Sequence, residues 1–314
     1  ESRGLGDVYK RQVQLIKMNT TMKKVTKYIA LLIGGIALLS MAACSDDDGR
    51  TPSPAVDPNC IGASFVGDNI GYEELEDTDP KELTLTISRD KTEAAATVAI
   101  EVQANTENIF NIPQSVSFAA GQATADLVIT FENAQLKEEY SFQISLEAAA
   151  VNPYKGNGHA SFTVQCLKWV DVSGTFAFKD WVFDEYNAGK EYNVKVQRVD
   201  GENRYRIVDP FSQALAESGE EVGEPDEYLF FTINPKNNGV AFDSYNTGYL
   251  TEEGSDILGF SSLDYLGVDD VDSKYDPTSH KMTLNVYYYG DGLIGQKESV
   301  LTVPDDFKLI LEDE

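Results

Sequence analysis

Hydrophobic and polar residues alternate with a period of two over much of residues 60–166, the pattern of half-buried β-strands. Residues 83–87 (LTLTI) and 140–146 (YSFQISL) show it most clearly, and turn signals such as Asp79-Pro80 interrupt it. The spacing predicts a seven-stranded antiparallel sandwich of the immunoglobulin-like kind. The seven predicted strands cover residues 61–66, 83–87, 98–102, 116–118, 125–131, 140–146 and 160–164.

Residues 167–314 also carry alternating runs, and we expect them to form a second β-rich domain, either a sandwich or a barrel. No long amphipathic helix pattern competes, although residues 211–223 suit either a short helix or a loop. The predicted fold class is therefore all-β. In the run Tyr287-Tyr288-Tyr289, alternation places Tyr288 on the face opposite its two neighbours. Strands are predicted in this domain at residues 174–178, 192–198, 205–208, 228–233, 282–289 and 299–303.

The N-terminus has a different pattern. Residues 1–17 show neither period, and we interpret them as a non-native leader that resembles translated adapter sequence. Lysines then precede the apolar run 28–39 (YIALLIGGIALL), and small residues follow it up to Cys44. This run is too short for a membrane-spanning helix, which needs about 20 apolar residues. Residues 18–43 are therefore predicted to be a secretory signal peptide.

Cys44, preceded by Met41-Ala42-Ala43, resembles the lipobox of bacterial lipoproteins, in which leucine is commoner at the position of Met41. The resemblance implies a lipoprotein signal peptide and a diacylglycerol thioether on Cys44, which would anchor the chain to a membrane. The acidic run at residues 45–49 (SDDDG) resembles the surface-export signal of Bacteroidota lipoproteins, and a solvated linker start is the alternative. Residues 44–59 are expected to be a flexible acidic, proline-containing linker.

Residues 115–121 (SVSFAAG), 127–131 (LVITF) and 139–146 (EYSFQISL) resemble the second half of a Calx-β-type domain. The resemblance implies a Calx-β-like sandwich for residues 60–166. It does not extend to calcium binding, because calcium-binding relatives cluster aspartates where this chain has Asn133-Ala134-Gln135. Residues 169–176 and 205–211 resemble uncharacterised C-terminal domains of Bacteroidota surface lipoproteins, a likeness that implies an architecture and no activity.

The chain is strongly acidic. It has 25 Lys and Arg residues against 52 Asp and Glu residues, which gives a formal net charge of −27. Nucleic acid is therefore not expected as a partner, because no basic footprint meets the phosphates. Cys60 and Cys166 lie at the opening and closing edges of the first predicted domain. Export implies an oxidising route, so a disulfide between them is one expectation, and two free thiols are the other.

Catalytic motifs are absent from the sequence. The two histidines fall in different predicted domains, and no nucleophile elbow, zinc-protease motif, P-loop or dinucleotide-binding fingerprint occurs. We therefore predict no cofactor and no enzymatic activity. A carboxylate-based glycoside hydrolase is the weaker alternative, because such enzymes need only two suitably placed acids. Asp269, Asp270 and Asp272 are weak calcium candidates in an acidic loop that also holds Asp264 and Asp276, and a solvated loop is the competing interpretation.

Aromatic residues offer the other candidate chemistry. Phe242, Tyr245 and Tyr249 fall in a segment that looks like a loop, where exposed rings would contact a ligand such as a glycan, although β cores also consume aromatics. The predicted function is a lipid-anchored bacterial surface protein with a non-catalytic binding or structural role, on the outer membrane and facing outward. The alternative is a glycan-binding accessory of a polysaccharide-capture system. The expected partners are the membrane, through the lipid at Cys44, and a glycan or surface protein.

Overall fold

The computed structural model describes residues 55–67, 70–155, 157–269 and 272–311. The predicted leader, the signal peptide, Cys44 and most of the linker lie outside these residues. The described chain divides between Trp169 and Val170 into two compact units. We call residues 55–169 the N-terminal unit and residues 170–311 the C-terminal unit, and describe each by itself. Strands dominate both, which confirms the predicted all-β class.

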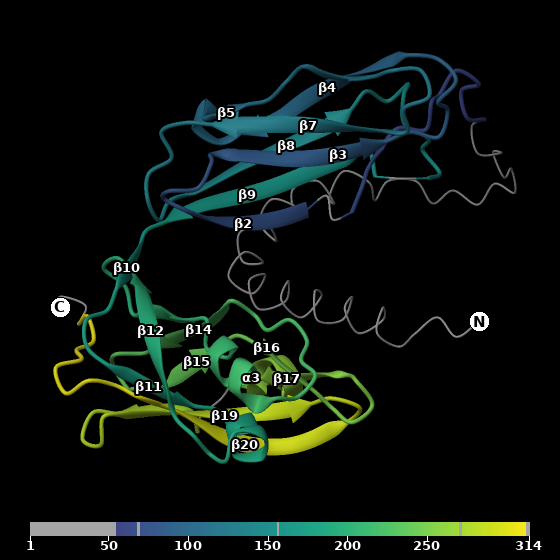
Figure 1. Ribbon diagram of the computed structural model, residues 1–314. Helices are drawn as coiled ribbons and strands as arrows, with labels where there is room; N and C mark the ends of the chain where they lie inside the picture. Colours follow the sequence, from purple (N-terminus) through teal and green to yellow (C-terminus); the bar gives the residue numbers. More distant parts are fainter. Residues whose placement is uncertain (1–54, 68–69, 156, 270–271, 312–314) are drawn as a thin grey trace, which may run out of the picture. The chain divides into compact units, whose positions relative to one another are not determined.

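The N-terminal unit is a sandwich of two sheets (Figure 1). Its strand order matches the arrangement of immunoglobulin-like domains, with the fourth, eighth and ninth strands at the centre of one sheet. One sheet runs β1 (Ser64–Phe65), β3 (Glu82–Ser88), β7 (Thr124–Phe131) and β5 (Phe110–Asn111). The other runs β2 (Ile70–Glu76), β9 (His159–Leu167), β8 (Glu139–Leu146), β4 (Ala96–Asn105) and β6 (Ser115–Phe118).

A tyrosine corner supports the same assignment. Tyr140 lies at the start of β8 and is 4% exposed, and its hydroxyl accepts a hydrogen bond from the backbone N–H of Gln135 at 3.2 Å. Immunoglobulin-like domains place such a tyrosine where the chain crosses between the sheets. Further along β8, Phe142 and Ile144 continue the inward face and are fully buried. The period of two in the sequence thus corresponds to one core-facing side of the strand.

Arg89 closes one end of the N-terminal unit. Its side chain is buried, and its guanidinium donates to the carbonyl oxygens of Gln122 (2.8 Å), Ala94 (2.8 Å) and Ala119 (2.7 Å). The same group lies over the ring of Phe118, 4.9 Å from its centroid. Buried backbone carbonyls need donors, and one arginine here supplies several of them at once.

Two strands of this unit differ from the sequence prediction. β2 and β5 were not predicted, so the described residues of the sandwich form nine strands, and β2 pairs with β9 in parallel, so the sandwich is not purely antiparallel. β2 (IGYEELE) is an edge strand with three glutamates and no fully buried position, so its sequence carries no hydrophobic alternation. β5 has only two residues. Backbone pairing holds β2 beside β9, together with the hydrogen bond that Tyr72 donates to Gln165 Oε1 at 2.7 Å, and hydrophobic patterning records neither.

The C-terminal unit is built on one long antiparallel sheet (Figure 1). Its two end strands, β15 and β16, are separated in sequence only by Asp243 and Ser244, so the sheet has to curl until its ends approach. The path runs β15 (Val240–Phe242), β14 (Tyr228–Ile233), β13 (Arg204–Val208), β12 (Tyr192–Val199), β11 (Phe176–Lys179), β20 (Leu293–Thr302), β19 (Lys281–Tyr289), β17 (Asp256–Phe260) and β16 (Tyr245–Leu250). Off this path, β10 (Trp169–Asp171) pairs with β12, and β18 (Lys274–Asp276) pairs with β19.

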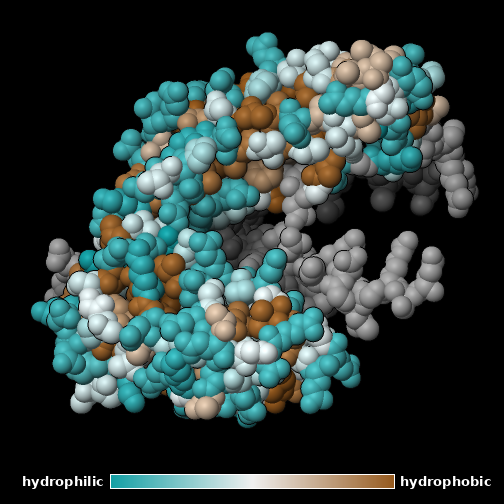
Figure 2. All heavy atoms as spheres, viewed as in Figure 1, coloured by the Kyte–Doolittle hydropathy of each residue, from teal (hydrophilic) through white to brown (hydrophobic). Residues whose placement is uncertain are grey.

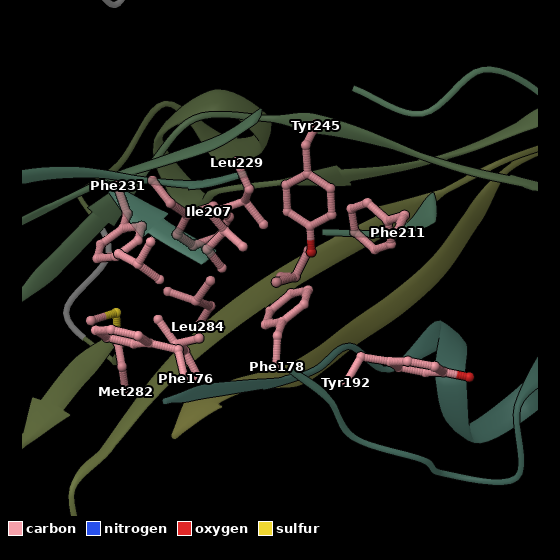
Figure 3. Close-up of a cluster of buried hydrophobic side chains, with 14 of the residues drawn as sticks. Phe176, Phe178, Tyr192, Ile207, Phe211, Leu229, Phe231, Tyr245, Met282 and Leu284 are labelled. Atoms are coloured by element: carbon pink, nitrogen blue, oxygen red, sulfur yellow. The ribbon is translucent and has the colours of Figure 1, made fainter. Parts of the chain in front are cut away.

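The curled sheet encloses an aromatic core. Figure 3 shows Phe211 and Tyr245 side by side in it, and their rings lie 5.6 Å apart at an angle of 24°. Phe211 immediately precedes α3 (Ser212–Ser218), so residues 211–223 contain the short helix that the sequence left open. Gly219 ends this helix with a φ of 72°, a conformation that favours glycine. Two further short helices, α2 (Val182–Tyr186) and α4 (Ser262–Leu266), complete the unit.

Hydrophilic residues prevail on the face drawn in Figure 2, with smaller hydrophobic patches between them. Of the helices in the part of the chain that the structure describes, none has the length and apolar character needed to cross a membrane.

Candidate functional site

A polar groove of about 550 Å³ lies on the outer face of β18, β19 and β20. Every side chain that lines it is polar or charged, and we call it the β19 groove. β19 supplies its central row, β18 one wall and β20 the other. The lining residues are Asp272, Lys274, Asp276, Ser279, Lys281, Thr283, Asn285, Gln296 and Glu298.

Strand alternation puts these side chains on one face. Along β19, Met282, Leu284, Val286 and Tyr288 are buried in the core, so the residues between them point outward. The sequence prediction that Tyr288 faces away from Tyr287 and Tyr289 is confirmed, since Tyr288 is fully buried and its neighbours are half-buried.

Antiparallel pairing then sets the neighbours across the strands. Asp276 of β18 stands opposite Lys281 of β19, and Lys274 stands opposite Thr283. On the other side of β19, Asn285 stands opposite Glu298. Directly opposed side chains have Cβ atoms about 4.5–5.5 Å apart, so donors and acceptors alternate at close range across the groove.

Several groups in the groove have no partner in the part of the chain that the structure describes. Among the described residues, the side chains of Lys274, Lys281 and Glu298 form no hydrogen bond or ion pair. Asp276 is different, because its carboxylate accepts hydrogen bonds from Ser279 Oγ (2.7 Å) and from the backbone N–H of Thr278 (2.8 Å). These hydrogen bonds hold the pKa of the Asp276 carboxyl below its usual range.

An aromatic pair lies at the end of the groove. Tyr287 follows Asn285 on the outer face of β19 and stands opposite Gln296. Tyr265 of α4 stacks on Tyr287 with ring centroids 5.0 Å apart and an angle of 16°. Ser261 Oγ caps α4 by accepting a hydrogen bond from the backbone N–H of Asp264, which fixes the start of this helix. The Tyr287 ring is therefore held in place from one side.

The C-terminal core holds a second polar cluster, around Asp180. This carboxylate is completely buried and accepts hydrogen bonds from the hydroxyls of Tyr288 (2.7 Å), Tyr245 (2.8 Å) and Ser299 (3.0 Å). The backbone N–H of Val182 donates a fourth at 3.1 Å. Burial raises the pKa of the Asp180 carboxyl above its ordinary value, and the hydrogen bonds from Tyr288, Val182 and Tyr245 act in the opposite direction.

Asp180 ties together elements far apart in sequence. Its four donors belong to the start of α2 and to strands β16, β19 and β20. It does not line the β19 groove, which lies on the other face of β19. We therefore assign it a structural role. Its role was not predicted from the sequence, in which the only signal is one acid inside an aromatic segment (FKDWVF).

The expected exposed aromatic loop is not present. Phe242, Tyr245 and Tyr249 are 4%, 2% and 1% exposed and belong to the core of the C-terminal unit. Phe242 ends β15 and Tyr245 begins β16, so only the two residues between them form a turn. The polar residues of this segment suggested a loop, but the adjoining aromatic residues point inward from strands. These three side chains are not available as a ligand platform, and that expectation was wrong.

Of the two alternatives for the cysteines, the structure has the free thiols, because Cys60 and Cys166 are both unbridged and buried. Cys60 Sγ donates to the carbonyl oxygen of Ala150 at 3.3 Å, close to where Phe65 pairs with Asn157 just before β9 begins. Cys166 lies near the other end of β9, roughly 20 Å further along at the usual rise of a strand. A disulfide needs Cα atoms within about 7 Å, so the two cysteines are too far apart.

The acidic loop does not gather its carboxylates in the described residues. Asp269 and Asp272 are exposed, and Asp270 lies outside the described residues. Asp264 accepts a hydrogen bond from the backbone N–H of Ser244 at 3.1 Å and thereby stabilises the β15–β16 turn. Over residues 55–67, 70–155, 157–269 and 272–311, no group of three His, Cys, Asp or Glu side chains is placed to hold a metal ion.

Comparisons with known proteins give only distant similarities. No protein-family model matches the sequence, and no curated protein does. Among solved structures, a PapD-like domain of human CEP192 covers 40% of this chain and 99% of its own, with 11% identity and a TM-score of 0.28. A Bacteroides ovatus protein of unknown function covers 77% and 93%, with 10% identity and a TM-score of 0.27. An auxiliary nutrient binding protein from Bacteroides thetaiotaomicron covers 75% and 89%, with 12% identity and a TM-score of 0.26. TM-scores this low carry no argument about this chain.

Proposed function

We propose that this protein is a lipid-anchored bacterial surface protein that binds a polar ligand in the β19 groove without changing it chemically. The observation that supports binding is the groove itself. It is a concave surface lined only by polar and charged residues, in which the side chains of Lys274, Lys281 and Glu298 have no partner among the described residues. Groups that point into a groove without internal partners are free to exchange water for a ligand.

The pKa shifts of the acidic side chains favour binding without hydrolysis. A glycoside hydrolase of the carboxylate type needs one acid whose pKa is raised, so that it can donate a proton. In the groove, the pKa of Asp276 is lowered by its hydrogen bonds, which is the opposite of what a general acid requires. Among the described residues, burial raises the pKa of two carboxyls, Asp180 in the core of the C-terminal unit and Glu73 on β2 of the N-terminal unit, and neither lines the groove.

The anchor is proposed from the sequence alone. The basic start, the short apolar run and the small residues before Cys44 support lipidation at that thiol. The acidic, proline-containing residues after it favour a tether that holds the units away from an anionic membrane, and the net charge of −27 favours the same arrangement. The outer membrane and the outward orientation rest on the resemblance to Bacteroidota lipoproteins.

Binding is tested by saturation-transfer NMR on the full chain in detergent, against neutral sugars, uronic acids, amino acids and polyamines. We expect at least one class to bind, and the signal to fall in Lys281→Ala and Glu298→Ala. Gln143→Ala changes an exposed side chain on β8 of the N-terminal unit and serves as the control that should retain the full binding signal. Binding by no class, or binding that survives both groove variants, would refute the proposal. Cleavage of the compound that is lost in Glu298→Gln would show a hydrolase instead.

Anchoring is tested separately in bacteria that express the full chain and are fed a clickable fatty acid. The chain should become labelled, and Cys44→Ser should not. Equal labelling of both forms, or of neither, would contradict lipidation at this thiol.

A further inference from the structure

We infer that the ligand of the β19 groove is a neutral oligosaccharide that lies lengthwise along β19. The inference rests on the proposed function and adds the class of ligand and its direction. Three observations carry it: the mixture of charges in the groove, the spacing of its outward side chains and the aromatic ring at its end.

The groove mixes charges of both signs at short range, with three carboxylates, Asp272, Asp276 and Glu298, beside the ammonium groups of Lys274 and Lys281. Lys281 stands directly opposite Asp276, and Glu298 lies on the far side of β19, opposite Asn285. An anionic ligand drawn to either lysine would meet these carboxylates, and the net charge of −27 would repel it further. A cationic ligand would in turn meet Lys274 and Lys281. The net charge of −27 draws cations toward the protein, but these two ammonium groups repel them inside the groove, so no ion of either sign meets a lining of the opposite charge alone.

Hydrogen-bonding capacity, in contrast, is plentiful and of both kinds. Lysine ammonium groups donate, carboxylates accept, and the side chains of Thr283, Asn285 and Gln296 do both. A sugar hydroxyl likewise donates one hydrogen bond and accepts others. A neutral polyhydroxylated ligand is the class that uses such a mixed surface without leaving an uncompensated charge.

The geometry favours an extended ligand. Lys281, Thr283, Asn285 and Tyr287 succeed one another on the outer face of β19, about 6.8 Å apart at the rise of an antiparallel strand. The row spans about 20 Å from its first to its last member. Its regular steps suit a molecule that repeats the same polar unit, such as a linear oligosaccharide.

Tyr287 supplies an apolar contact at the end of this row. Because Tyr265 stacks on one face of its ring, the ring is already oriented, and binding costs little further side-chain entropy. An aromatic ring beside hydrogen-bonding groups matches a sugar, which has an apolar face and a polar rim. Gln296 stands opposite Tyr287 across the strands and joins the ring to the polar part of the groove.

The experiment is calorimetric titration of the full chain in detergent with two series of linear oligosaccharides of increasing length, one neutral and one made of uronic acids. We expect the neutral series to bind, with affinity that rises until the oligosaccharide fills the row of about 20 Å and then levels off. Gln296→Ala and Tyr287→Ala should each weaken binding about tenfold, or about 1.4 kcal/mol. Gln143→Ala and Tyr154→Ala, exposed positions in the N-terminal unit, are the matched controls and should change nothing.

The outcomes separate the two proposals. Groove-dependent binding of the uronic-acid series alone would overturn the inference of a neutral ligand and leave the proposed function standing. If the neutral oligosaccharides bind and neither Gln296→Ala nor Tyr287→Ala weakens this binding, the inference and the proposed site are both overturned. If neither series binds, the inference fails, and the panel of small molecules above decides the proposed function. Gln296→Ala changes an exposed side chain, so it reports on binding even if Tyr287→Ala disturbs the packing of α4.

Discussion

Asp180→Asn should change how the stability of the C-terminal unit depends on pH. The variant keeps the size of the side chain and removes its charge. In the native protein this carboxyl is completely buried, and burial raises its pKa. An acid with a raised pKa binds more protons when folded than when unfolded, so its contribution to stability is fully present below its unfolded pKa of about 3.9. That contribution is lost as pH rises through the folded pKa.

The size of the effect follows from this linkage. One group that carries its proton only in the folded state changes the unfolding free energy by about 1.4 kcal/mol per pH unit. The many exposed carboxylates of the chain titrate as well, but they are the same in both proteins and cancel in the difference. We therefore compare the unfolding free energy of Asp180→Asn with that of the wild type. The difference, variant minus wild type, should rise by at most about 1.4 kcal/mol per pH unit from about pH 4 up to the pKa of Asp180 in the folded protein, and then level off.

The measurement is urea unfolding of the full chain between about pH 4 and pH 8, because urea does not screen charges. Trp181 fluorescence reports on the C-terminal unit, since its ring contacts Tyr288 next to Asp180, 5.1 Å between centroids. The other tryptophan of the chain, Trp169, is replaced by phenylalanine in both proteins, so that the fluorescence comes from Trp181. A difference that stays flat across this range, or that falls as pH rises, would refute the reasoning, because Asp180 would then have an ordinary or lowered pKa in the folded state.

Three further predictions concern the N-terminal unit. Arg89→Lys should lower its unfolding free energy by about 3 kcal/mol, measured by urea unfolding, because one ammonium group cannot reach all the carbonyls that the guanidinium serves; a loss below about 1 kcal/mol would contradict this role. Tyr140→Phe should cost about 1 kcal/mol in the same assay through the lost tyrosine-corner hydrogen bond, whereas an unchanged midpoint would show that the hydroxyl contributes nothing. In Cys44→Ser protein, Cys60 and Cys166 should react with a thiol reagent only after denaturation, and burial, which raises the pKa of Cys166, slows its reaction further; absence of reaction in the denatured, unreduced protein would mean a disulfide.

The strands with strong alternation could be predicted from the sequence because their burial is local information. In β7 and β8 every second side chain is apolar, and those side chains form the core. The same rule places Tyr288 inside and Tyr287 outside, so the direction of the ring at the end of the groove also follows from local alternation. β2 lacks such a pattern, because three of its residues are glutamates, and its place beside β9 depends on long-range pairing that the local sequence does not record.

Tertiary structure alone decided which aromatic residues are exposed and which polar residues meet. Phe242, Tyr245 and Tyr249 look like loop residues in the sequence, and the curl of the sheet buries them. The β19 groove draws on three strands whose register comes from pairing, so Glu298 and Asn285 become neighbours only in the folded sheet. Local patterning says which face of a strand is apolar, but long-range hydrogen bonds choose its neighbours, and a site made of neighbours cannot be read from one strand at a time.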